Sequence, residues 1–178
     1  NKKGEVELDR ACEPIKFMMD LYMKPSNMII AHHRQPTASA NYLDQTHPIF
    51  VSNKLLQFDY YIVHNGIISN DTDLFKKHKE LGFEYTTQYK EISSWQYYQN
   101  QTKLKFNDSE CIAIELALFI ENKISAIGLD NSAAFIILQT DKEKNLATKV
   151  FYGRNGISSD LNMSKTRGEL RISSVGKG

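Results

Sequence analysis

Residues 60–68 (YYIVHNGII) constrain the fold more than any other stretch of this chain. An apolar run that stops at Asn-Gly is usually a strand entering a tight hairpin turn, because both residues tolerate a positive φ. Here the apolar return after Gly66 is only two residues long, and residues 69–73 (SNDTD) offer several helix N-caps. The sequence therefore predicts a strand over 55–64 that places the Asn-Gly pair at its end, beside a helix.

The Asn65-Gly66 pair has two interpretations. An exposed side-chain amide and a glycine N–H that a ligand can approach would suit an oxyanion hole, in which two fixed donors stabilise a developing negative oxygen. An ordinary turn is the alternative, and turns account for most Asn-Gly pairs. The pair alone favours the turn, so the choice depends on the other motifs of the chain.

Length and charge exclude several classes of protein. The 178 residues fit one domain, and a hydrophobic content of 41% allows a sizeable core. The 22 basic and 21 acidic residues are interleaved, so nothing indicates a nucleic-acid or membrane surface. No apolar run approaches the ~20 residues of a membrane span, and no signal peptide is visible. We therefore expect a cytoplasmic domain that binds neither nucleic acid nor membranes.

The cysteines and histidines indicate no metal or disulfide chemistry. Cys12 and Cys111 are too few for a disulfide framework and have no metal-ligand spacing. The adjacent His32 and His33 would point to opposite faces of a strand, with no Cys or carboxylate at ligand spacing nearby. The chain also has no glycine-rich phosphate loop, so we expect neither a metal nor a cofactor.

Hydrophobic periodicity predicts an α+β fold, because strands group at both ends of the chain with two helices between them. The predicted helices are 6–23, 71–81 (closed by Gly82) and 108–123, the last with Asn107 and Glu110 as a capping box. The predicted strands are 28–31, 48–51, 55–64, 132–139, 147–152 and 169–174. Turns are predicted at 141–145 and 153–156, and residues 83–106 read as a long loop.

Three segments offer groups that together suit an amino-acid amide. Arg34 could bind an α-carboxylate with two parallel hydrogen bonds, and Asp108 could bind an α-ammonium. Asn65 and Gly66 would then supply the oxyanion donors for a side-chain amide that becomes tetrahedral. The combination suggests a site for glutamine or asparagine.

These segments, in this order, resemble the glutaminase domain of class II glutamine amidotransferases, which are N-terminal-nucleophile (Ntn) hydrolases. The family pattern Gly-His-Thr-Arg-x-x-Thr resembles residues 31–37 (AHHRQPT), and Val-His-Asn-Gly-Ile-Ile matches 63–68 at every position. Further similar elements are His47-Pro48-Ile49, 107–110 (NDSE), 151–154 (FYGR) and 172–174 (ISS). The resemblance covers roughly residues 28–175.

The resemblance implies a fold, a reaction and a set of site residues. The fold would be a four-layer αββα sandwich, with two antiparallel sheets face to face and helices outside. The reaction would be hydrolysis of glutamine to glutamate and ammonia, with the ammonia passing to an acceptor site elsewhere. The implied roles are Arg34 and Thr37 on the α-carboxylate, Asp108 on the α-ammonium, Asn65 and Gly66 in the oxyanion hole, and His47 at the pocket edge.

The chain departs from the family at the nucleophile, which is a Cys at the mature N-terminus followed by Gly. This chain opens with Asn1, Cys12 precedes Glu13-Pro14 in a predicted helix, and Cys111 falls on a predicted buried helix face. We expect residues 1–178 to form a single amidotransferase domain without its native N-terminal strand, and without a synthetase domain, which would be a partner domain or subunit. The alternatives are a nucleophile-less glutamine-binding or structural module, or another Ntn hydrolase that cleaves a different amide.

Overall fold

A computed structural model describes residues 3–10, 26–32, 43–91, 103–157 and 160–174. These residues form an α+β fold of antiparallel sheets with two α-helices, which confirms the predicted class. In chain order the elements are η1 (Leu43–Gln45), β1 (Ile49–Val51), β2 (Asp59–Ile68), α2 (Asp71–Glu80), β3 (Tyr89–Glu91), β4 (Lys103–Lys105), α4 (Asp108–Ile120), β5 (Asn131–Thr140), β6 (Ala147–Asn155), β7 (Asn162–Thr166) and β8 (Glu169–Ser173).

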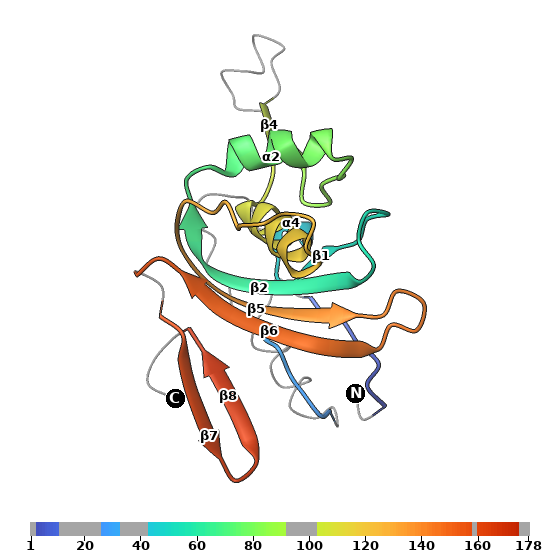
Figure 1. Cartoon of the computed structure of the whole chain (residues 1–178), viewed down its shortest axis with the longest axis vertical. Helices are drawn as coiled ribbons and strands as arrows, with labels where there is room; N and C mark the ends of the chain where they lie inside the picture. Colours follow the sequence, from blue (N-terminus) through green and yellow to red (C-terminus); the bar gives the residue numbers. More distant parts are fainter. Residues whose placement is uncertain (1–2, 11–25, 33–42, 92–102, 158–159, 175–178) are drawn as a thin grey trace.

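The main sheet has the strand order β1-β2-β5-β6, and each neighbouring pair is antiparallel. Its centre is the ten-residue ladder between β2 and β5, which runs from Asp59↔Thr140 to Ile68↔Asn131. Figure 1 shows α4 against one side of this sheet, with α2 beyond α4, and the β7–β8 hairpin extending away beyond the edge strand β6. The helices therefore cover one face of the main sheet and leave the other face to the rest of the chain.

Helix α4 is the centre of the hydrophobic core. All of its residues from 109 to 118 are buried, because the helix lies between the sheet and α2. An amphipathic surface helix would bury only one stripe, so α4 is a core helix. Its apolar side chains pack against those of β1, β2 and β5, including Ile49, Tyr60, Ile62 and Ile137.

The start of α4 confirms one half of the predicted capping box and contradicts the other. Asn107 is the N-cap, and its side chain accepts a hydrogen bond from the Ser109 N–H at 3.0 Å. Glu110 does not reach back to Asn107. Its buried carboxylate instead accepts hydrogen bonds from the N–H groups of Thr86 and Thr87, both at 2.8 Å. Glu110 therefore anchors the loop before β3, and the buried charge is satisfied by that loop.

Helix α2 and the β5–β6 hairpin were largely predicted. Helix α2 ends as expected before Gly82, which has a φ of +82°. Strands β5 and β6 contain the predicted strands, with Asp141 accepting hydrogen bonds from two N–H groups in the turn. The turn predicted at 153–156 is wrong, because β6 continues through Gly153 to Asn155. Gly153 instead allows the Phe135 ring to pack closely on β6, since an added Cβ would lie 3.1 Å from that ring.

Two predictions near the N-terminus are wrong where the structure describes them. Residues 6–10 of the predicted helix 6–23 are not helical, because Val6 donates its N–H to Asn145 and Glu5 bridges Leu146. Residues 11–23 lie outside the described part of the chain. Residues 28–31 form no strand, and Met28 and Ile29 are about half exposed. A short apolar run becomes a strand only where a partner strand pairs with it.

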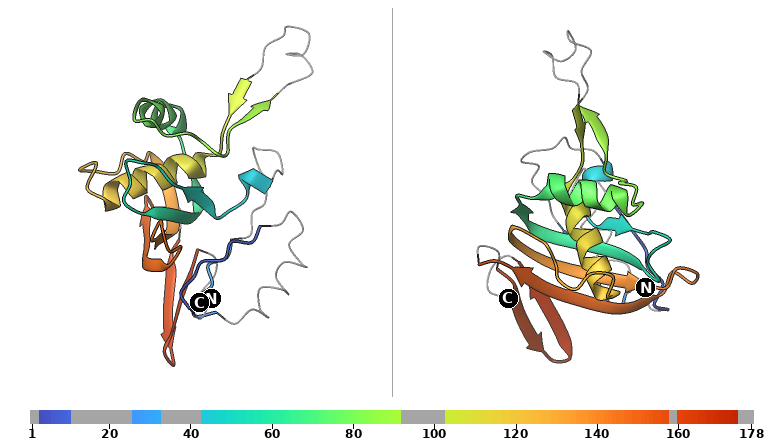
Figure 2. Two further views of the ribbon diagram at one scale, coloured as in Figure 1. Left: turned by 90° about the vertical axis from the view of Figure 1, so that its right-hand side faces the viewer. Right: turned by 45° about the horizontal axis from the view of Figure 1, so that its top comes forward.

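The predicted long loop 83–106 is partly ordered into a hairpin. Strands β3 and β4 pair antiparallel from Tyr89↔Lys105 to Glu91↔Lys103. Figure 2 shows this pair projecting away from the main sheet, beyond the helices. Residues 92–102 are outside the described ranges.

Candidate functional site

The Asn65-Gly66 pair lies inside a strand. Strand β2 continues through the pair to Ile68, with Asn65 opposite Ala134 and Gly66 opposite Ala133 of β5. The predicted strand end at His64 and the alternative of a hairpin turn are therefore both wrong. Pairing with a long neighbouring strand holds this segment extended despite its turn-forming composition. As predicted, the Asn65 side chain is exposed.

Gly66 occupies a position that no other residue could fill without rearrangement. Its φ is +139°, a backbone conformation that residues with a Cβ rarely adopt. A Cβ built at this position would lie 2.2 Å from the Ser132 carbonyl oxygen and 2.7 Å from the Ala133 Cα. The glycine therefore permits a close approach of β2 to β5 beside Asn65.

Three histidines meet beside this pair. The His47 Nε2 lies 3.2 Å from the His64 Nδ1, and the His64 Nε2 lies 3.1 Å from the Gly66 carbonyl oxygen. The His32 ring packs on the His47 ring with a centroid distance of 3.9 Å. His47 and His64 are both buried. The His47-Pro48-Ile49 element and the VHNGII segment are thus joined directly by side chains.

A cavity of about 310 Å³ opens at Asn65. Three of the segments that line it carry sequence motifs, namely residues 31–32, 63–65 and 172–174, and residues 134–136 of β5 and Leu161 complete the lining. Its polar lining groups come from all three, whereas the rest of the lining is mostly apolar. The lining residues are Ala31, His32, Val63, His64, Asn65, Ala134, Phe135, Ile136, Leu161, Ile172, Ser173 and Ser174.

The remaining predicted site residues stand in different relations to this cavity. His47 packs behind it, in contact with the lining residues His32 and His64. Asp108 is the first residue of α4, is partly exposed, and does not line the cavity. The neighbouring Asn107 donates a hydrogen bond to the Gln45 carbonyl at 3.0 Å, which ties the start of α4 to η1, two residues before His47. Arg34 and Thr37 lie outside the described residues.

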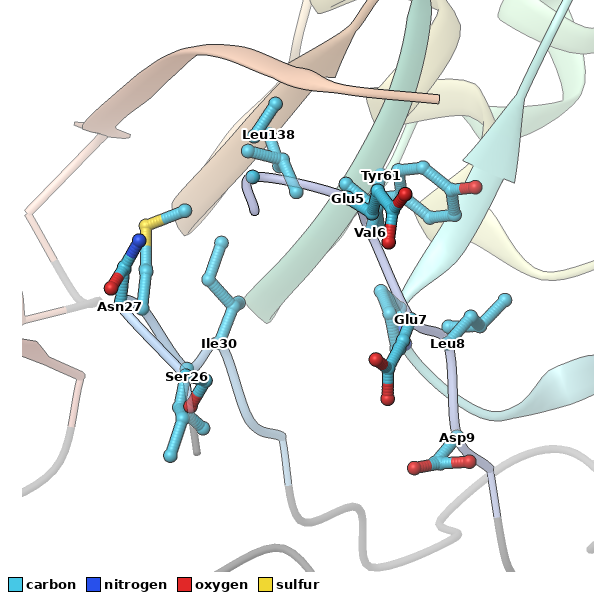
Figure 3. A pocket seen from close by; sticks show the side chains of 15 residues that line it. Glu5, Val6, Glu7, Leu8, Asp9, Ser26, Asn27, Ile30, Tyr61 and Leu138 are labelled. Carbon is cyan, nitrogen blue, oxygen red and sulfur yellow. The ribbon is translucent and has the colours of Figure 1, made fainter. Parts of the chain in front are cut away.

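A second cavity of similar volume lies on the same face of the main sheet (Figure 3). Tyr61 and Leu138 form part of its lining, and the extended segments 4–9 and 26–30 form its walls. Tyr61 and Asn65 project to the same face of β2 because side chains alternate along a strand. Among the predicted site residues that the structure describes, none lines this second cavity, whose charged lining groups are Glu5, Glu7 and Asp9.

Sequence reasoning missed several groups around the site. Ser173 and Ser174 were assigned to a closing strand but not to the cavity that they line. Arg10 was placed in a helix, yet its Nη2 donates to the Pro48 carbonyl at 2.7 Å, next to His47. Burial lowers the pKa of the Arg10 guanidinium, against the opposing effect of Asp44, Tyr61 and Glu110. The places of Arg10, Ser173 and Ser174 depend on contacts between distant segments, which the sequence does not show. The position of His64 directly before Asn65 was a signal in the sequence that could have identified His64 as a site residue.

Between α2 and α4 lies a separate buried network of polar side chains. Glu115 is fully buried and accepts hydrogen bonds from Lys77, from the His78 Nε2 at 2.9 Å, and from the Gly128 N–H at 3.2 Å. Burial would raise the pKa of its carboxyl, but these donors outweigh burial and lower the pKa to about 2. Glu115 is therefore an anion held by a complete set of donors.

The same network contains Cys111. The Tyr85 hydroxyl lies 2.6 Å from the His78 Nδ1 and 3.2 Å from the Cys111 sulfur, to which it donates. Burial raises the pKa of the Cys111 thiol to about 12. A thiol that stays protonated and has no exposure is a poor nucleophile, so Cys111 has the structural role that the sequence predicted. Cys12 lies outside the described residues.

Comparison with known proteins found no protein-family model and no curated protein that matches this chain. Within the described ranges, no group of three His, Cys, Asp or Glu side chains could hold a metal ion. Neither helix of the described part combines the length and apolar character needed to cross a bilayer.

Proposed function

We propose that this chain is the glutaminase domain of a class II glutamine amidotransferase. It would hydrolyse glutamine to glutamate and ammonia, and the ammonia would be used at an acceptor site on another domain or subunit. The observation that carries the proposal is the convergence of three motif segments on one cavity. Segments around residues 31, 64 and 173 were matched to the family separately, and all three line the cavity at Asn65.

The chemistry of the cavity supports an amide substrate. A volume of about 310 Å³ is at the lower end of the range for small-molecule sites. Asn65 is exposed and lines the cavity, and Gly66, which is not among the lining residues, follows it directly with a φ of +139°. Two such donors beside a glutamine side chain would stabilise the oxyanion formed when a nucleophile attacks the amide carbon. By the resemblance, Arg34 and Thr37 would hold the α-carboxylate and Asp108 the α-ammonium, with Asp108 at the start of α4 and not in the lining of this cavity.

The arrangement of the main sheet supports the finer fold assignment, the four-layer αββα sandwich. Helix α4 packs on one face of the sheet, whereas the opposite face carries both cavities and the exposed side chains of Val150 and Tyr152. A second antiparallel sheet stacked on that face would bury these side chains. Ile172, Ser173 and Ser174 at the end of the β7–β8 hairpin line the Asn65 cavity on that face, and the hairpin itself extends beyond the edge strand β6 (Figure 1).

A second candidate is a glutamine-binding or structural module without a nucleophile. In the family reaction, a terminal cysteine thiolate attacks the amide carbon, ammonia leaves, and water hydrolyses the γ-glutamyl thioester to glutamate. The observation that favours the module is the state of the thiol in the described chain, since Cys111 is buried and protonated.

The decisive experiment measures ligand binding and ammonia release on the native, full-length protein, together with its N-terminal sequence. The enzyme predicts a free N-terminal cysteine, ammonia release from L-glutamine, and binding that D-glutamine does not reproduce. The module predicts L-glutamine binding by calorimetry without ammonia release. Arg34→Lys should weaken binding strongly in either case, because a lysine cannot form the two parallel bonds. Absence of glutamine binding would overturn both candidates.

A further inference from the structure

The hydrogen bonds of His64 determine where its protons lie. The Gly66 carbonyl oxygen can only accept, so the His64 Nε2 at 3.1 Å must carry a hydrogen and donate it. When the ring is neutral, the His64 Nδ1 is then an acceptor, and it receives the Nε2 hydrogen of His47 at 3.2 Å. The chain of donors therefore runs from His47 through His64 to the Gly66 carbonyl.

This chain of hydrogen bonds fixes a backbone rotation. The φ and ψ angles of Gly66 together relate the peptide plane that carries its N–H to the plane that carries its carbonyl. His64 holds the carbonyl, while the β5 backbone at Ser132 and Ala133 closes the space where a Cβ would lie. The φ of +139° is therefore held from both sides, and with it the direction of the Gly66 N–H.

His47 is itself held in place. It is buried, its ring packs on His32 at a centroid distance of 3.9 Å, and Pro48 follows it. The adjacent Pro48 carbonyl accepts a hydrogen bond from Arg10 at 2.7 Å. A ring fixed on several sides can orient its neighbour because few rotamers remain open to it.

We propose that His64, oriented by His47, is a positioning residue that sets the Gly66 N–H as an oxyanion donor. This inference deepens the proposed function and rests on it. His64 would not touch the substrate amide. It would act by keeping the 65–67 backbone in the conformation in which the Asn65 amide and the Gly66 N–H are both directed at one oxygen, so its loss would affect the transition state more than substrate binding.

The first test observes the protons directly in the wild-type protein. Long-range ¹H–¹⁵N spectra of the imidazole rings at neutral pH should show His64 and His47 as neutral rings that carry the hydrogen on Nε2. This measurement requires neither activity nor a variant that might unfold. A His64 ring with its hydrogen on Nδ1 would overturn the proposal, because that ring could not donate to the Gly66 carbonyl.

The second test compares two substitutions in the full-length protein. His64→Phe keeps the ring volume and removes both nitrogens, and should lower kcat for glutamine hydrolysis about 10²-fold with KM changed less than about threefold. His64→Gln can still donate to Gly66 and accept from His47, and should restore much of the lost kcat. Unchanged kcat in the Phe variant, or equal losses in both variants, would overturn the positioning role.

His78→Phe is the matched control, since it replaces another buried histidine that lies between α2 and α4 and not at the cavity. It should lower thermal stability while leaving kcat and KM unchanged at temperatures where the variant is folded. A wild-type protein that neither binds nor hydrolyses glutamine would overturn the proposed function itself. An active wild type with a fully active His64→Phe variant would overturn the positioning role alone.

Discussion

Two regions of this molecule bury histidine, and they differ in what surrounds it. Between α2 and α4, His78 has a carboxylate on one ring nitrogen and a tyrosine hydroxyl on the other, and the cluster has no contact with either cavity. Beside Asn65, the ring nitrogens of His64 contact a second histidine on one side and a backbone carbonyl on the other, and His64 lines a cavity. The first arrangement is closed around a buried carboxylate, whereas the second has no carboxylate among these ring contacts and borders a cavity.

This difference predicts that substitutions in the two regions have different effects, on stability in one and on function in the other. A buried anion with a complete set of donors is costly to disturb, because removing one partner leaves the others unsatisfied. A polar group at a cavity is easier to remove without unfolding the protein, since water can replace the lost partner. Substitutions in the α2–α4 network should therefore reduce stability, and substitutions at the Asn65 cavity should reduce function.

Glu115→Ala should give the largest loss of stability. It removes the shared acceptor of Lys77, His78 and the Gly128 N–H and leaves a cavity inside the core. We expect a loss of about 3–5 kcal/mol in the free energy of unfolding, measured by urea denaturation. Asp73→Ala is the control, because Asp73 pairs with Lys76 at the surface and its removal should be neutral. Equal losses of unfolding free energy for Glu115→Ala and Asp73→Ala would show that the buried network does not stabilise the protein more than a surface ion pair does.

Gly66→Ala should reduce stability although Gly66 belongs to the candidate site, because the conformation of this residue is fixed by packing against β5. The added methyl would overlap the β5 backbone at a positive φ, and we expect a loss of about 3–4 kcal/mol. Gly82→Ala is the matched control, since Gly82 has a φ of +82° but nothing lies within 4 Å of its added Cβ. It should cost only about 1 kcal/mol in the same denaturation experiment. A tolerated alanine at 66 would contradict the close approach of β2 to β5.

Acid should destabilise the protein through Glu115. Its pKa is lowered in the folded state from 4.5 to about 2, so its contribution to stability is fully present above pH 4.5. The contribution is lost as the pH falls from 4.5 through 2, and its size is roughly 3 kcal/mol. Urea denaturation of the wild type and Glu115→Gln across this range measures it. A variant with the same pH dependence as the wild type would show that another carboxyl is responsible.

Asn65→Ala should have the smallest effect on stability and a large effect on activity. The side chain is exposed, so the free energy of unfolding should change by less than about 0.5 kcal/mol. If the protein hydrolyses glutamine, kcat should fall roughly 10²–10³-fold with binding nearly intact. Ammonia release and calorimetry on the same sample make both measurements. Unchanged turnover would leave Asn65 as a strand residue without a catalytic role.

Sequence patterns correctly predicted the elements whose conformation is set by residues a few positions apart. Helix α2, the N-cap Asn107 and the β5–β6 hairpin were predicted because caps, periodicity and turn residues act over a few positions. The same rules failed where a distant segment decides the conformation. Asn65-Gly66 was placed at a strand end because the ladder to β5 is invisible in the sequence, and residues 6–10 were called helical because their bond to Asn145 is equally invisible.

The candidate site was found by a different kind of information. The order of the motifs identified Asn65, His47 and Asp108 as a set, although spacing along the chain gives no distance between them. The contact of His47 with His64 supports the set, whereas Asp108 remains outside the cavity lining. Ser173 and Arg10 could not be inferred, because their places depend on packing between segments more than 30 positions apart.

The β2–β5 ladder also has a consequence for how the protein is made. Its partners are separated by 63 positions at Ile68↔Asn131 and by 81 at Asp59↔Thr140. Such non-local pairs form slowly, because the intervening chain must be closed into a loop before the contacts stabilise it. On a ribosome adding about 5–20 residues per second, β2 would be synthesised several seconds before its partner. Until β5 is present, no neighbouring strand holds the backbone at Gly66 in its final conformation. The site is therefore assembled only after β5 has been synthesised.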